Sequence, residues 1–324
     1  MKKVLLVLVA LPVLSYISFK VYVHYKASDF LEDLVAPASS EFTLDYGWVS
    51  SSLNGAAGLQ DVRLLIKRTG DEILIDSIEV DAGNLEDLVK LSSKKRSKEF
   101  PKQLSLKIHG LAVEFSSEYY HVLEDNIDEY IPELGAPTVE CGDINPYGFS
   151  HFRDLGYGGA KIDMEIGYRN IEDTTLTVVM NVGIEDMQRY YSTIKYDMTD
   201  FISNPLVALQ RNESPKLLSA DVRVVDLSYN RRLLDYCTAH GNTSREAIME
   251  QLIEVLEFQA MRFLDLKAAF NLGETERAQV RRYLSDSSEL DIHINPRDPI
   301  DFKYLKFYKP EDIPLILNLS LVSM

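Results

Sequence analysis

The strongest constraint on the fold is a period-two alternation of apolar and polar residues near the middle of the chain. Successive side chains of a strand point to opposite faces, so each alternating run predicts a strand with one apolar face. A short polar link at residues 170–173 joins two such runs, which predicts an antiparallel hairpin. The apolar positions of this hairpin that we treat as a candidate site are Ile162, Met164, Ile166, Leu176, Val178 and Met180.

The same alternation predicts further strands on both sides of the hairpin. They are expected at residues 62–66, 73–75, 104–115, 194–198, 290–294 and 315–321. In the run 104–115 the apolar phase changes at Gly110. Side chains on the two sides of this glycine cannot face one core without an extra residue, so we expect a bulge there.

Helical spacing of apolar residues occurs mainly late in the chain. It predicts helices at 120–130, 231–240, 243–270 and 274–284. Thr243 and Glu246 have the spacing of a capping box at the start of the longest one. The expected fold class is therefore α+β: a mainly antiparallel β-sheet with a late helical insertion at 231–284, preceded by one N-terminal transmembrane helix.

The transmembrane helix is expected from the first 26 residues. Two lysines precede an almost wholly apolar stretch from Val4 to Val23, and about 20 apolar residues suffice to cross a bilayer core of about 30 Å. A cleaved signal peptide is the alternative, but no A-x-A pattern follows the apolar core. Lys2 and Lys3 favour a cytoplasmic N-terminus. We therefore expect a single-pass membrane protein, anchored through residues 4–23, with its body in the periplasm or an equivalent lumen.

Charge and length agree with that placement. The first 26 residues contain four of the 34 basic residues and none of the 50 acidic ones, so the remaining chain has 30 basic and 50 acidic residues, a net charge of −20. Such a surface repels nucleic acid, which we exclude as a partner. The predicted divisions are an anchor at 1–26, a β-rich region at 27–135 and a second β-rich region with the helical insertion at 136–324.

Cys141 and Cys237 are the only cysteines of the chain. In an oxidising compartment they are candidates for a disulfide, which would close a long loop and contribute about 4 to 5 kcal/mol in the chain-entropy model. The alternative is two buried thiols too far apart to bond. The two cysteines lie too far apart in the sequence, with no further cysteine, so no zinc site is predicted.

The sequence offers no candidate for catalytic chemistry. The sequence contains no G-x-S-x-G, H-E-x-x-H, P-loop or G-x-G-x-x-G motif in a suitable context. We therefore predict no enzyme activity, no catalytic residue, no metal site and no cofactor. Glutamates on the helix 243–270, Glu250 and Glu257 among them, are more typical of a solvated face than of a cation site. The pair Arg281-Arg282 is more typical of ion pairing with nearby acids than of a phosphate site.

What covers the apolar face of the sheet decides between two functions. In one interpretation the helix 243–270 and a second layer close the core, and the protein is a scaffold. In the other, part of the face lines a groove for acyl chains or for an apolar segment of a partner. The six hairpin residues given above are the candidate ligand-binding residues of the second interpretation.

A resemblance to a known family concerns the N-terminal part. Tyr46-Gly47-Trp48, Gly55, Gly58-Leu59, Asp61-Val62 and Ile78-Glu79-Val80, after the apolar leader, resemble the opening of AsmA-like bacterial envelope proteins over residues 1–115. This resemblance implies an inner-membrane anchor, a β-rich periplasmic body and a link to lipid traffic. Asp226-Leu-Ser-Tyr and Arg231-Arg-Leu-Leu resemble uncharacterised proteobacterial envelope proteins instead.

Together these features predict a non-enzymatic, membrane-anchored periplasmic scaffold or accessory binding protein in envelope maintenance, with an envelope protein as partner. Lipid or hydrophobe binding in a groove of the sheet is the first alternative. An envelope hydrolase is the second alternative, and it would require polar residues that converge in one pocket.

Overall fold

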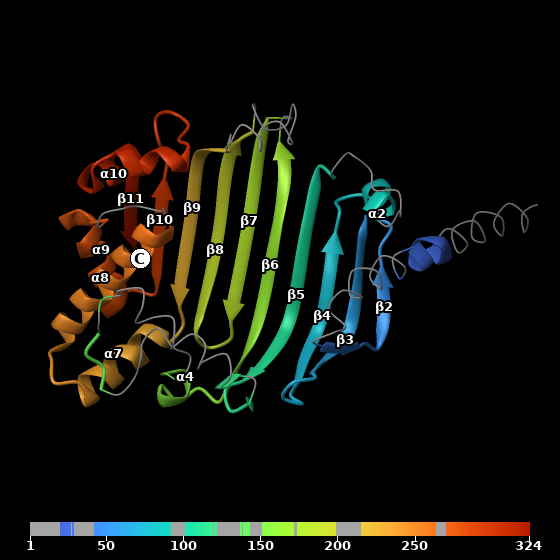
Figure 1. Ribbon diagram of the computed structural model, residues 1–324, viewed down its shortest axis with the longest axis horizontal. Coiled ribbons are helices and arrows are strands. Elements are labelled where there is room, and N and C mark those ends of the chain that lie inside the picture. Colours follow the sequence, from blue (N-terminus) through green and yellow to red (C-terminus); the bar gives the residue numbers. More distant parts are fainter. Residues whose placement is uncertain are drawn as a thin grey trace, which may run out of the picture. The chain divides into compact units, whose positions relative to one another are not determined.

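The computed structural model describes residues 20–26, 28, 42–91, 101–118, 120–121, 137, 139–142, 151–171, 174–198, 215–263 and 270–324 (Figure 1). The chain divides into two compact units, Met1–Ala112 and Val113–Met324. The division predicted after residue 135 falls in the range 131–136, which is outside the described residues.

The first unit contains an antiparallel sheet and a short helix. Its strands are β1 (Phe42–Asp45), β2 (Trp48–Ser51), β3 (Ala56–Ile66), β4 (Glu72–Asp81) and β5 (Gln103–Glu114), and its helix is α2 (Leu85–Leu91). Both β1 and β2 pair with β3, which is followed by β4 and β5. A small core that includes Leu59, Val62 and Leu88 holds α2 against the sheet. The strands predicted at 62–66 and 73–75 are therefore present, within β3 and β4.

The phase change predicted at Gly110 coincides with an irregular backbone. Gly110 has a φ of 63°, and the ladder between β4 and β5 ends at the preceding residue, His109. A Cβ at position 110 would overlap the Asp76 carboxylate. Glycine is therefore required both by the left-handed backbone and by the close approach of β4.

The second unit contains a longer set of antiparallel strands, which we call the second sheet. Its strands are β6 (Gly159–Ile171), β7 (Thr175–Ile184), β8 (Gln188–Asp197), β9 (Lys216–Asp226), β10 (Glu289–Ile294) and β11 (Leu319–Ser323). Each strand pairs with the next in sequence order. Helices α7 (Tyr229–His240), α8 (Arg245–Phe263) and α9 (Glu274–Ser285) lie between β9 and β10 in the sequence, and the short α4 (His151–Asp154) precedes β6. The α+β class with a late helical insertion is confirmed.

Two local predictions are wrong. The strand expected at 315–321 begins only at Leu319, because residues 313–316 form helix α10 (Ile313–Ile316) with Pro314 in its first turn. Asn318, with a φ of 47°, makes the turn from this helix into β11. In α8 the capping side chain is Ser244, whose hydroxyl accepts a hydrogen bond from the Ala247 amide at 3.3 Å, and not Thr243.

Helices cover one face of the second sheet at its β9–β11 end. Buried residues of α7, α8 and α9 form one cluster with Leu290 of β10 and Leu321 of β11. A second cluster joins Leu217 and Ala220 of β9 to Leu305, Ile313 and Leu317. Figure 1 shows these helices gathered toward β10 and β11, whereas β6 and β7 reach the first cluster at one end, through Ala160 and Ile184.

Most of the predicted anchor cannot be compared with the structure. Residues 1–19 are outside the described residues, and 20–26 are helical. Within the described part of the chain, no helix has the length and apolar character needed to span a membrane. The helix predicted at 120–130 also falls almost wholly outside the described residues.

Candidate functional site

The six predicted ligand-binding residues lie on one face of the β6–β7 hairpin. In the ladder Ile166 is opposite Met180, Met164 is opposite Val182, and Tyr168 is opposite Val178. Directly opposite residues of neighbouring strands share a face. We call the set Ile162, Met164, Ile166, Leu176, Val178 and Met180 the β6–β7 strip.

The strip continues a face that helices cover farther along the sheet. The ladder places Met164 in one row with Val182 of β7, Tyr190 of β8, Val224 of β9 and Leu290 of β10. Val224 and Leu290 pack in the cluster formed with α7, α8 and α9. One apolar face therefore runs from the covered β9–β11 end to the strip.

The strip itself is only partly covered. Within the described residues, none of its six side chains packs against a buried hydrophobic cluster. Ile166 is 44% exposed and Met180 is 40% exposed. The remaining four side chains are half-buried. The helix expected to close this face, α8, instead packs through Ile248 and Ile253 with the cluster that contains Leu290.

A polar cluster that the sequence interpretation missed lies at the N-terminus of α7. The Asp226 carboxylate accepts hydrogen bonds from the Asn230 amide at 3.0 Å and from Gln188 at 3.4 Å. Nearby, the Tyr157 hydroxyl lies 2.6 Å from the Ser228 hydroxyl. The signal for this cluster was Asp226 and Ser228 directly before a helix, since both residue types are frequent at helix starts.

Burial sets the protonation of this cluster. Desolvation raises the pKa of the Asp226 carboxyl above its ordinary value of 3.8, although its hydrogen bonds oppose the shift. Desolvation also raises the pKa of the Tyr190 hydroxyl, which donates to Gln188. The cluster contains no histidine, lysine or nucleophile paired with a base. It is therefore best explained as a cap that fixes α7 on the sheet.

The raised pKa of Asp226 gives a testable pH dependence. Between the unfolded and the folded pKa the unfolded chain has already lost its proton, so the stability of the wild type falls as the pH rises through this window. Asp226→Asn removes that fall and keeps an oxygen that accepts from Asn230. We expect D226N to gain stability relative to the wild type as the pH rises, measured from urea unfolding midpoints across an acidic-to-neutral pH series.

The control for this prediction is Asp226→Ala, which removes the charge and the acceptor together. It should lose about 1 kcal/mol relative to D226N at every pH, because the Asn230 amide loses its cap. A D226N variant whose midpoint follows that of the wild type at every pH would contradict the role of the buried charge.

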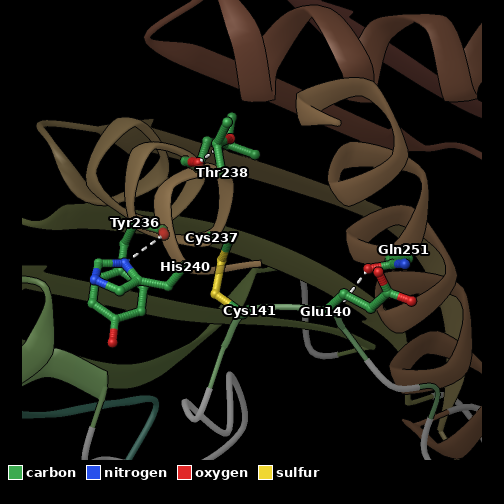
Figure 2. The surroundings of a disulfide bond; sticks show 8 residues. Glu140, Cys141, Tyr236, Cys237, Thr238, His240 and Gln251 are labelled. Carbon is green, nitrogen blue, oxygen red and sulfur yellow. Dashed lines mark hydrogen bonds between the residues drawn. A yellow bond between two sulfur atoms is a disulfide. The ribbon is translucent and has the colours of Figure 1, made fainter. Parts of the chain in front are cut away.

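A disulfide bond joins Cys141 to Cys237 of α7, and both residues are fully buried. Figure 2 shows the short segment around Cys141 between α7 and α8. The Glu140 amide donates to the Gln251 side chain of α8 at 2.8 Å. At Gly241 a Cβ would meet the Glu140 carbonyl oxygen at 2.6 Å, so only glycine allows this approach. The bond therefore fixes an upstream segment between two helices of the insertion.

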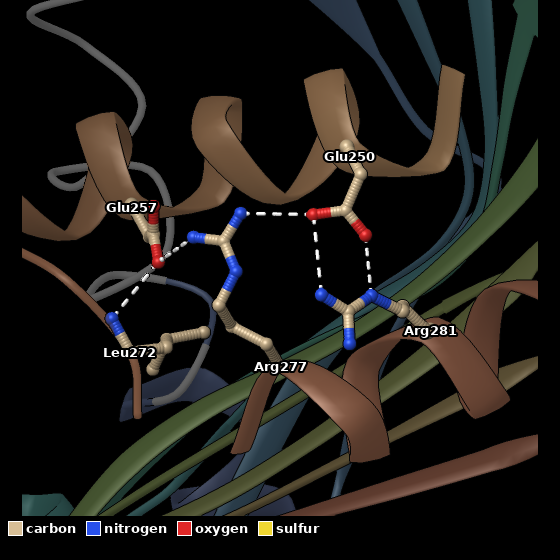
Figure 3. A network of polar contacts seen from close by, with 5 residues as sticks. All are labelled: Glu250, Glu257, Leu272, Arg277 and Arg281. Atoms are coloured by element: carbon tan, nitrogen blue, oxygen red, sulfur yellow. Dashed lines mark hydrogen bonds and ion pairs between the residues drawn. The ribbon is translucent and has the colours of Figure 1, made fainter. Parts of the chain in front are cut away.

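Ion pairs join α8 to α9 (Figure 3). Arg277 donates to Glu257 at 2.7 Å and to Glu250 at 3.0 Å, and Arg281 also pairs with Glu250. Glu257 is buried and accepts the Leu272 amide at 2.8 Å as well. Hydrogen bonds from Arg281 and Arg277 hold the pKa of Glu250 below its ordinary range. The arginine at 281 thus pairs with local acids, as predicted. Glu257 is buried against α9 and is not on a solvated face, whereas Glu250 pairs with α9 and keeps 38% of its side chain exposed.

No residue set in the described ranges has the geometry of a metal site with three or more histidine, cysteine or carboxylate ligands. The strip is an apolar surface of the second unit that the hydrophobic clusters of the described residues leave uncovered.

A family model described as "Uncharacterized protein" matches residues 158–323, slightly more than half of the chain. The chain belongs to this family. The matched range begins at the residue before β6 and ends in β11. It therefore contains the complete second sheet, the strip and the helical insertion with Cys237, whereas Cys141 lies outside it. No curated protein matches the chain.

Proposed function

We propose that the protein is a non-enzymatic accessory protein of the bacterial envelope that binds an apolar ligand, such as a lipid acyl chain, on the β6–β7 strip. In this proposal residues 4–23 anchor the chain in the inner membrane and the body lies in the periplasm. The observation that carries the binding function is the exposure of Ile166 and Met180 on a face whose continuation is covered by helices.

The dimensions of the strip suit an extended apolar chain. Ile162 and Asn170, the residue opposite Leu176, are eight positions apart along β6, which is about 27 Å at the rise of an antiparallel strand. One leaflet of a bilayer core is about 15 Å thick. An extended acyl chain that is long enough to cross one leaflet is therefore shorter than the strip and fits along it.

Three further features support the proposed location of the body in the periplasm. The body is strongly acidic, with a net charge of −20 after residue 26. A buried disulfide between Cys141 and Cys237 is typical of proteins in an oxidising compartment. The likeness of residues 1–115 to AsmA-like envelope proteins implies the same side of the same membrane.

Photo-crosslinking in intact cells tests the ligand. A photoreactive phenylalanine analogue is placed at position 180 in the strip or at position 191. Met180 and Tyr191 lie on adjacent strands and are both 40% exposed, but they face opposite sides of the sheet. We expect position 180 to crosslink lipid and position 191 not to do so, with adducts identified by mass spectrometry of the purified chain.

The same experiment separates the alternatives. Protein adducts specific to position 180 would favour the scaffold function over lipid binding. Equal crosslinking at both positions, or none at either, would reject the strip as a binding surface.

Substitutions in the strip should weaken binding without unfolding the sheet, because Ile166 and Met180 are already partly exposed. Each of Ile166→Asn and Met180→Asn removes apolar contact worth about 1 to 2 kcal/mol, so the yield of lipid adducts formed from a neighbouring strip position should fall about 5- to 30-fold. The matched control is Tyr191→Asn, which should leave the yield unchanged. A strip variant that crosslinks lipid as well as the wild type would contradict the proposal.

A further inference from the structure

A second exposed apolar surface lies in the connection between β10 and β11. Leu315 is 81% exposed and Phe307 is 75% exposed, and they are the two most exposed large apolar side chains in the described part of the chain. Tyr304 and Tyr308 are 53% and 51% exposed. These side chains lie in η2 (Phe302–Phe307), directly after it, and in α10.

These side chains gather at one place on the surface. Tyr304, Tyr308 and Leu315 line the same pocket of about 470 Å³. The Tyr304 and Phe307 rings have centroids 6.4 Å apart. Lys306 and Lys309 are exposed among them, with the Lys306 ammonium 5.7 Å from the centre of the Phe307 ring. We call Tyr304, Lys306, Phe307, Tyr308, Lys309 and Leu315 the aromatic–lysine patch.

The base of this connection is firmly held. Leu305, Ile313 and Leu317 are buried in a cluster with Leu217 of β9. The Asp301 carboxylate accepts the Lys303 amide at 3.0 Å and caps η2. Because these contacts fix the backbone on both sides, the exposure of Phe307 and Leu315 is a stable property of the fold.

The composition of the patch distinguishes between two kinds of partner. Lysine is depleted at the core of protein–protein interfaces, where arginine accompanies the aromatic residues. Aromatic rings interspersed with lysines are instead typical of surfaces that lie in the interfacial region of a bilayer. Residues 302–309 contain three lysines and no acidic residue, in a chain with a formal net charge of −16.

We propose that the aromatic–lysine patch docks on the surface of a bilayer that contains anionic lipids. Phe307 and Leu315 enter the boundary between headgroups and acyl chains, and Tyr304 and Tyr308 lie at headgroup level. Lys306 contacts anionic headgroups. Lys309 contributes less, because Glu311 lies 3.9 Å from its ammonium group. This contact is additional to the predicted anchor and does not depend on a ligand in the β6–β7 strip.

Fluorescence of the full chain in vesicles tests the proposal. The chain has a single tryptophan, Trp48. Replacing it by phenylalanine (Trp48→Phe) leaves an introduced tryptophan as the only one in the chain. Phe307→Trp then reports on the patch, and Tyr191→Trp on the exposed polar face of β8 provides the control. In vesicles containing phosphatidylglycerol and lipids with a nitroxide on the acyl chain, we expect blue-shifted emission and strong quenching for F307W and neither for Y191W.

Charge reversal tests the headgroup contact. A lysine near an anionic surface is worth about 1 kcal/mol, so Lys306→Glu in the F307W background should weaken quenching by at least about fivefold. The decrease should occur with phosphatidylglycerol and be much smaller with phosphatidylcholine alone. Circular dichroism of each variant checks that the fold is retained.

Three results would overturn the proposal. Absent quenching of F307W in a chain that floats with the vesicles would overturn the patch and leave the anchor intact. Equal quenching of F307W and Y191W would overturn it as well, because the contact would then be non-specific. A chain that does not float with vesicles at all would overturn both the anchor and the patch, whereas crosslinking at the strip would remain a separate result.

Discussion

Replacing Cys141 and Cys237 together by alanine should lower the free energy of unfolding by about 4 to 5 kcal/mol. The bond joins residues 96 positions apart, and cross-linking a loop of about 100 residues removes that much chain entropy from the unfolded state. Alanine is preferred to serine because both sites are fully buried and a hydroxyl there would lack water. The measurement is guanidinium unfolding, with free thiols counted by alkylation and mass spectrometry.

The single variants provide the controls. Cys141→Ala and Cys237→Ala should each lose nearly as much as the double variant, since either one breaks the bond. Reducing agent should bring the wild type close to the double variant and leave that variant unchanged. A wild type purified from cell membranes with two free thiols would contradict the prediction, and would also argue against an oxidising location of the body.

Arg277→Ala should cost about 3 to 5 kcal/mol of stability. Among the described residues, Arg277 is the side-chain cation that pairs with Glu257, and Glu257 has a side-chain exposure of only 8%. Removing one partner of a buried ion pair leaves an uncompensated charge, which is the costly outcome. Loss of the second contact with Glu250 would also loosen α9 from α8. Urea unfolding followed by circular dichroism gives the change.

Two further variants provide a control and test whether the buried charge causes the loss of stability. Arg282→Ala changes the exposed arginine five positions along the same helix and should shift stability by no more than about 0.5 kcal/mol. Glu257→Gln combined with Arg277→Ala removes the buried charge but keeps an oxygen for the Leu272 amide. The double variant should therefore be more stable than R277A alone; if it is less stable, charge burial is not the cause.

The strands of the second sheet could be predicted from sequence where apolar residues recur at every second position over most of a strand. The β6–β7 hairpin is an example, because every second residue from Ile162 to Tyr168 and from Leu176 to Ile184 is apolar and lies on one face. In contrast, β8 was expected only from Ile194, although it begins at Gln188. Gln188 and Ser192 occupy positions on the apolar face, and they interrupt the periodicity that predicts a strand.

Sequence patterns were less informative where a local rule competed with periodicity. The leucines at 315, 317, 319 and 321 alternate like a strand. Pro314 and the acidic residues before it start a helical turn instead, so Leu315 is exposed and Leu317 is buried. Pattern alone could therefore not predict the aromatic–lysine patch, which depends on that turn.

The candidate site was partly predictable for the same reason. Periodicity places Ile166 and Met180 on one face, but it cannot say which part of that face the helices cover. Coverage depends on tertiary contacts such as those of Ile248 and Ile253 with the β10–β11 end. Likewise, the spacing of Glu250 and Glu257 fits a solvated face, and only the position of α9 reveals that it supplies their arginines.

The position of Cys237 has a consequence for the order of assembly. Cys237 is followed by 87 residues, so during synthesis it emerges well before β10 and β11. The loop that ends at Cys237 contains β6, β7, β8 and β9, and it can be locked while β9 still has a free edge. An unpaired edge invites pairing with other chains. A nascent chain halted at this stage should therefore depend on chaperones until β10 adds to β9.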